Sequence, residues 1–163
     1  MAKKKSGANI SKICLALGLL LGIAAICMMF VGGVTWGNTT YTGLQTAFGY
    51  TQETNLVLTT AKTEIFAFSF MNLLTYILAL AGVVLCLLNM LAHKSSKLFA
   101  FVSAAAFIVS AVFFFLAPQF SIPMLLGSSV QGSVELALGI GSILGGVFSG
   151  IAGLSTLASC FVK

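Results

Sequence analysis

Apolar residues occupy four long stretches of this chain, separated by short polar segments. The stretches cover about residues 13–34, 65–92, 98–117 and 134–162. Each is long enough for a helix to cross about 30 Å of hydrocarbon at about 1.5 Å per residue. The pattern therefore predicts an all-α integral membrane protein, a single domain of four transmembrane helices in an antiparallel bundle. Residues 35–64 and 118–133 would form two loops on one side of the membrane, and residues 93–97 a loop on the other.

Local signals place the ends of these predicted helices. Pro118 cannot donate a backbone hydrogen bond, which favours a helix end close to it. Ser133 is a candidate N-cap for the fourth helix, and Glu135 would then lie in the first turn, where the helix dipole favours a negative charge. The first stretch is longer than the apolar region of a signal peptide and lacks a small-residue cleavage site, so we expect a retained span.

Composition supports a membrane environment. The chain is 59% hydrophobic and 7% charged, whereas soluble domains are about a quarter charged. The net charge of +5 comes from scattered lysines without arginine, a pattern that does not indicate nucleic acid binding. We therefore expect the lipid bilayer, and no nucleic acid, as the main partner, and a multi-pass location in the cell membrane.

The lysines also predict an orientation. With the N-terminus inside, the inner segments hold Lys3, Lys4, Lys5, Lys12, Lys94, Lys97 and Lys163, and only Lys62 lies outside. Cytoplasmic segments are enriched in basic residues. Both termini are thus expected in the cytoplasm, and the two longer loops outside.

The first outer loop combines threonine with aromatic residues, which favour strands. Residues 39–48 and 55–60 could pair as a small β-hairpin. We interpret Trp36, Tyr41 and Tyr50 as anchors at the lipid headgroups, in preference to a ligand or partner site. Asn38 begins an Asn-Thr-Thr match to the N-glycosylation pattern, which matters only in a eukaryotic secretory pathway.

Glycines form the second marked pattern. Small residues four apart lie on one helix face and let another helix approach closely. Two interpretations stay open: packing within one monomer alone, or packing plus contact with another subunit. The candidate assembly residues are Gly18 and Gly22 in the first helix and Gly141, Gly145, Gly146, Gly150 and Gly153 in the fourth.

Reactive side chains are scarce. The four cysteines fall inside predicted spans, and none forms a Cys-x-x-Cys pair. The only histidine, His93, lies at the inner side, whereas the three glutamates are predicted outside, so no metal site is expected. No catalytic pair is evident in the spacing of the glutamates. We therefore expect a non-enzymatic protein without a cofactor.

Coupled transport usually requires an ionisable residue within a span, and none of the four spans has one at its centre. A passive pore needs only polar side chains, for which Asn72, Thr75, Asn89 and Glu135 are the candidates. Hydrogen bonding between helices is the alternative role of the residues within the spans, and we favour it.

Four spans, both ends inside, a longer first outer loop and the pair Trp36-Gly37 together resemble the claudin-type tetraspan group. The similarity covers the topology of the whole chain but only this one motif, and the paired loop cysteines of that group are absent. It would imply an adhesive role. Our leading hypothesis is instead a scaffold or accessory subunit that assembles through its helices with itself or another membrane protein. An oligomeric channel or passive permease is the alternative.

Overall fold

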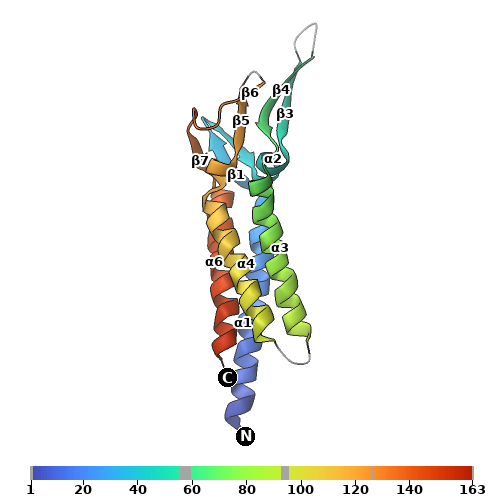
Figure 1. Ribbon diagram of the computed structural model, residues 1–163, viewed down its shortest axis with the longest axis vertical. Coiled ribbons are helices and arrows are strands. Elements are labelled where there is room, and N and C mark those ends of the chain that lie inside the picture. Colours follow the sequence, from blue (N-terminus) through green and yellow to red (C-terminus); the bar gives the residue numbers. More distant parts are fainter. Residues whose placement is uncertain (1, 56–59, 93–95, 126, 163) are drawn as a thin grey trace.

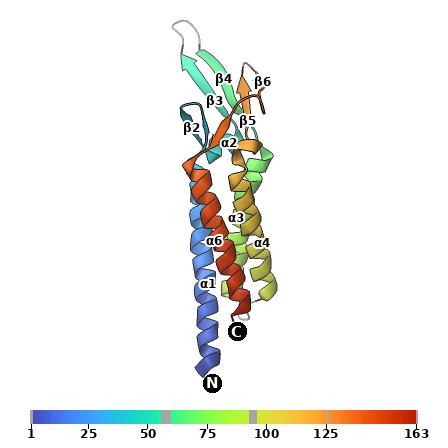
Figure 2. The same ribbon diagram turned by 90° about the vertical axis from the view of Figure 1, so that its left-hand side faces the viewer.

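Four long helices form a bundle, and strands cover one end of it (Figures 1 and 2). The computed structural model describes residues 2–55, 60–92, 96–125 and 127–162. The bundle helices are α1 (Ala2–Cys27), α3 (Phe70–Leu91), α4 (Lys97–Phe115) and α6 (Ile140–Phe161). Both termini lie at the end of the bundle opposite the strands, and α1 projects beyond the other helices there.

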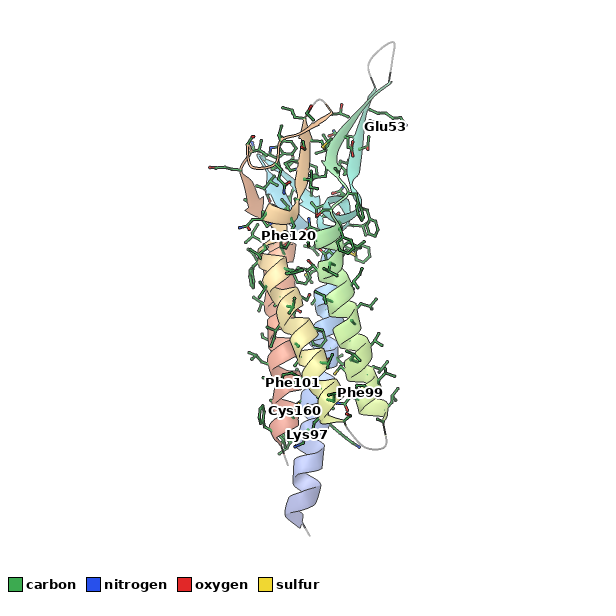
Figure 3. All side chains as sticks on the ribbon, viewed as in Figure 1. Glu53, Lys97, Phe99, Phe101, Phe120 and Cys160 are labelled. Carbon is green, nitrogen blue, oxygen red and sulfur yellow. The ribbon has the colours of Figure 1, made fainter. Side chains whose placement is uncertain are left out.

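All four helices are long and apolar enough to cross a membrane, in agreement with the sequence prediction. In α1 the apolar span begins at Ile10. Large apolar side chains remain exposed on the outside of the bundle, including Leu20, Leu80, Val112 and Leu154 (Figure 3). Such a surface is unstable in water but suits hydrocarbon, so this is a membrane protein.

The prediction of an all-α fold is wrong. The structure is about 67% helical and contains two antiparallel sheets with seven strands. One sheet has the order β2-β1-β7, and the other β3-β4-β5-β6. Their strands are β1 (Gly32–Trp36), β2 (Thr39–Thr42), β3 (Tyr50–Asn55), β4 (Thr60–Ala67), β5 (Ile122–Leu125), β6 (Ser128–Ser129) and β7 (Leu136–Leu138). We call these strands, together with α2 (Gly43–Phe48) and α5 (Ala117–Phe120), the cap.

The strands of the cap do not pair as predicted. Residues 39–48 do not form one strand, because the sequence from Thr42 to Gln45 makes a capping box that starts α2. Strand β2 pairs instead with β1 across the two-residue turn Gly37-Asn38. Gly37 has a φ of +60°, which L-residues rarely adopt, so the turn favours glycine.

Strand pairing also moves the helix boundaries. Residues 60–67, of which the last three belong to the predicted second span, form β4, which pairs with β3 and β5, and α3 begins only at Phe70. The Ser69 side chain caps α3 by accepting a hydrogen bond from the Asn72 backbone N–H at 3.4 Å. At the fourth span, β7 pairs with β1, so the helix begins at Ile140 with Gly139 as N-cap. Ser133 and Glu135 therefore precede the helix. The predictions that Ser133 is its N-cap and that Glu135 lies in its first turn are both wrong.

Serine hydroxyls tie the bundle helices together. Ser103 and Ser110 of α4 donate to the backbone carbonyl oxygens of Gly82 and Thr75 in α3, at 2.7 and 2.9 Å. Ser149 of α6 donates to the carbonyl oxygen of Phe107 in α4 at 2.8 Å. All three serines are fully buried or nearly so. Because lipid offers these groups no partner, each bond satisfies a hydroxyl inside the bundle.

Candidate functional site

The glycines of α6 contact other helices of the same chain. A Cβ added to Gly145 would lie 2.7 Å from the ring of Phe114, and one added to Gly146 would lie 2.8 Å from the ring of Phe115. At Gly153 a Cβ would lie 2.8 Å from Ile108. All three contacts are with α4. The close approach of α6 to α4 therefore depends on having glycine, which has no side chain, at these positions.

The remaining candidate glycines behave in the same way, with one exception. A Cβ on Gly141 would meet the Val31 backbone at 3.0 Å, and one on Gly22 would meet the Phe107 ring at 2.6 Å. A Cβ on Gly18 would collide with the hydroxyl of Thr156 in α6. Only at Gly150 is there room, since its nearest such neighbour is 3.9 Å away. The small-residue surface is thus used within the monomer.

The candidate pore residues of α3 are not brought together. Asn72 lies at the cap end of the helix and Asn89 at the opposite end. Each is buried and bonded within the chain: the Asn72 amide donates to Ser121 Oγ at 3.0 Å, and Asn89 Oδ1 accepts from the Ser96 backbone N–H at 2.7 Å. The Thr75 hydroxyl donates to the Met71 carbonyl oxygen at 3.1 Å. The Thr75 bond lies within α3, and the two asparagines bond to residues outside the long helices, so none of these three bonds is the contact between spanning helices that we expected.

The aromatic residues predicted as headgroup anchors pack between the two sheets. The ring centroid of Phe66 lies 4.9 Å from that of Tyr41 and 5.9 Å from that of Trp36, and both pairs are edge to face. The ring centroids of Tyr50 and Tyr41 are 6.0 Å apart. Phe66, which was assigned to the second span, is fully buried at the centre of this group. We call Trp36, Tyr41, Tyr50 and Phe66 the aromatic cluster, and its packing joins the sheets.

Glu135, the fourth candidate pore residue, lines an open groove in the cap. The groove has a volume of about 740 Å³, within the range of sites that hold small molecules. One wall is formed by β1, β7 and the residues before β7, and the other by α5 and the start of β5. We define this cap groove by Thr35, Gln119, Ser121, Gln131, Glu135 and Ala137.

Two observations show how the cap groove is held open. Gln131 donates its Nε2 hydrogen to the backbone carbonyl oxygen of Gln119 at 2.9 Å, which ties the segment before β7 to α5. Ser121, fully buried at the base, donates to the Ala117 carbonyl oxygen at 2.9 Å and accepts from Asn72. The walls are therefore anchored both to each other and to the bundle. Gln119, Gln131 and Glu135 remain exposed at the opening.

The charges of the cap are unevenly placed. Lys62 and Glu53 form a salt bridge of 2.7 Å on the β3–β4 hairpin, which projects away from the helix bundle (Figure 3). It is the one salt bridge found among the described side chains. Glu135 is the only charged residue that lines the cap groove. Since both partners of the bridge are on the hairpin, Glu135 has no salt-bridge partner among the described side chains.

The described residues offer little for catalysis. Among them, no group of three histidine, cysteine or acidic side chains is placed to hold a metal ion. Cys14, Cys27, Cys86 and Cys160 are free thiols. His93 lies outside the described residues. The cap groove supplies one carboxylate, amides and hydroxyls, which suit recognition of a polar or cationic group.

Sequence reasoning found only Glu135 among the residues of the cap groove. Thr35, Gln119, Ser121, Gln131 and Ala137 come from segments far apart in the chain, and no local motif joins them. The available signals were Pro118, Pro123 and the glycines at 127 and 132, which mark a folded connection between the third and fourth spans. They indicate turns but not which surfaces the turns bring together.

No protein-family model and no curated protein matches the chain. The fold and the groove define its class as a membrane protein with four candidate spanning helices and a two-sheet cap at one end.

Proposed function

We propose that this protein is a non-enzymatic scaffold or accessory subunit that binds another membrane protein through the cap groove. One observation supports the groove in particular: it is an open site whose one carboxylate has no salt-bridge partner among the described side chains, while the glycine surfaces expected to drive assembly pack inside the monomer. We therefore place the contact with the partner protein in the cap rather than on the bundle helices.

The proposal includes an orientation in the cell membrane. Lysines gather in the segments at the end of the bundle that carries both termini, and cytoplasmic segments are the ones enriched in lysine. The termini would then be cytoplasmic, and the cap would face outside. A cap groove on the outer side is accessible to extracytoplasmic parts of a neighbouring protein.

Site-specific photo-crosslinking in the native membrane tests the function. A benzophenone amino acid at Gln119, which is exposed in the cap groove, should give a discrete adduct with a second protein. The same probe at Thr63, exposed on β4 and outside the groove lining, is the control in the cap. Leu154, exposed on α6, is the control for the lipid-facing surface, where lipid adducts are expected.

The pattern of adducts decides between the contact surfaces. Protein adducts at Gln119 and not at the other two positions would support the proposal. A protein adduct at Leu154 alone would indicate instead that the protein assembles through its bundle helices. Lipid adducts alone, from a protein shown to be folded, would contradict a role in assembly.

A further inference from the structure

The free edge of β7 lies beside the cap groove. Strand β7 is the last strand of its sheet, with β1 on its other side, and α5 packs next to it. Leu136 and Ala137 of β7 line the groove. The strand therefore pairs with β1 along one edge, and its other edge has no strand partner within the described part of the chain.

The register shows which backbone groups this edge offers. The Gly139 backbone N–H donates to the Gly33 carbonyl oxygen at 2.9 Å, which makes these two residues a hydrogen-bonded pair. Such pairs recur every second residue in an antiparallel ladder, so the next is Thr35 with Ala137. The N–H and C=O groups of Leu136 and Leu138 consequently point away from β1. Within the described part of the chain, β7 pairs with no strand other than β1.

A peptide strand can be added at such an edge. Backbone N–H and C=O groups without a strand partner are the template for strand addition, in which main-chain hydrogen bonds hold an extended segment. Strand β3 is also an edge strand, but Glu53 and Lys62 of its hairpin already pair with each other. At β7, by contrast, α5 packs beside the strand, and residues of both elements line the cap groove.

The charge of the groove selects the side chain that the segment would carry. Glu135 directly precedes β7 and is the one charged residue among those that line the groove. A basic side chain opposite Glu135 would supply a countercharge.

We infer that the cap groove binds an extended segment of a partner protein, which adds to the β7 edge and places a lysine or arginine against Glu135. This inference rests on the proposed function and names the chemistry of the partner. The strand contact is short, because β7 has three residues, so the segment is expected to bind weakly and exchange rapidly.

A peptide selection on the full chain tests this inference. The protein in nanodiscs is panned with displayed linear dodecapeptides after depletion on empty nanodiscs. The selected sequences should be enriched in lysine or arginine within residues of high strand propensity. Panning on Glu135→Lys should reverse the charge preference. A selection that enriches no peptide, or the same basic peptides on both proteins, would overturn the inference.

The best selected peptide then gives two quantitative readouts. Its affinity should fall about two- to fivefold in Glu135→Gln, the loss expected for one exposed ion pair. It should not change in Glu64→Gln, which removes an exposed carboxylate of β4 outside the groove lining. Bound peptide should also slow hydrogen exchange of the Leu136 and Leu138 amides. Binding without that protection would exclude strand addition.

Spermidine is the probe for the competing occupant, a small organic cation. If spermidine binds the nanodisc protein as tightly as the selected peptide does, the groove recognises charge alone and the inference fails. The failure can be told from that of the proposed function: a protein adduct at Gln119 would keep the cap groove as a contact surface even if no strand is added to β7.

Discussion

At the scale of single residues, the glycines of α6 indicate how closely another helix can approach, but not which helix it is. Gly145 and Gly146 lie against the rings of Phe114 and Phe115, and larger side chains would collide with those rings. Spacing in the sequence marks them as a smooth helix surface but does not say which helix meets it. The structure places α4 there, in the same chain. Helix packing in the monomer accounts for Gly145 and Gly146.

Replacing Gly145 with leucine should therefore destabilise the fold. The new side chain would overlap the Phe114 ring inside a packed bundle, and overpacking of this kind costs about 1 to 3 kcal/mol. The free energy of unfolding can be measured by titrating a mild-detergent solution with a denaturing detergent. Gly150→Ala is the matched control, because its Cβ would have 3.9 Å of clearance from Ala111. An intact, equally stable Gly145→Leu monomer would contradict this packing role.

At the scale of elements, the cap depends on strands that the hydropathy pattern assigned to helices or loops. Phe66 lies in an apolar run that continues into α3, yet it belongs to β4 and is fully buried between the sheets. Trp36 and Tyr41 reach it from the other sheet. The aromatic cluster is thus a small hydrophobic core for the cap, separate from the core of the bundle.

Phe66→Ala should destabilise the cap but leave the bundle folded. Removal of a fully buried phenylalanine ring costs about 3 to 5 kcal/mol, and Trp36 and Tyr41 would lose their contacts with that ring. Hydrogen exchange should accelerate in β3 and β4, while α4 and α6 stay protected. Phe68→Ala is the control, since that ring is 52% exposed. Equal acceleration in the bundle would show that the cap and the bundle unfold as one unit.

The sequence was sufficient for the four long helices because length and hydropathy are local properties that a bilayer constrains strongly. It was insufficient for the sheets. A continuous apolar run such as that around Phe66 does not distinguish a strand from a helix, and pairing decides the outcome. The pairing of Thr35 with Ala137 joins two distant parts of the chain, which no local pattern specifies.

The cap groove was partly accessible to prediction. Glu135 could be identified because charged residues are rare in this chain, but it was assigned to a helix N-terminus and to a pore. Its actual setting depends on β7, a three-residue strand whose partner is distant in sequence. Gln119 and Gln131 carry no signal of their own, and the bond between them appears only in the folded chain.

At the scale of the whole molecule, the two ends differ in chemistry. The cap end has sheets, the groove and the aromatic cluster, and the other end has both termini and most lysines. Lys62 is the one lysine in the cap, where it pairs with Glu53. This asymmetry is the basis of the proposed orientation.

Reporter proteins can measure the orientation directly. A fluorescent protein that folds only in the cytoplasm should be fluorescent when it follows the C-terminus. A periplasmic phosphatase should be active in a bacterial host when it is inserted between Ser128 and Ser129, in an exposed part of the cap. The exchanged pair, phosphatase at the C-terminus and fluorescent protein in the cap, is the control and should be inactive. The opposite result would place the cap in the cytoplasm.

The placement of charge also bears on how the molecule responds to voltage. A transmembrane potential of 100 mV changes the energy of one elementary charge moved across the bilayer by about 2.3 kcal/mol. Residues 13–30, 70–91, 98–115 and 140–161 contain no ionisable acid or base of the aspartate, glutamate, lysine, arginine or histidine type. Rearrangements of these helices would move no such charge through the electric field. Polarising or depolarising the membrane should therefore leave the conformation of the bundle, and through it the shape of the cap, unchanged.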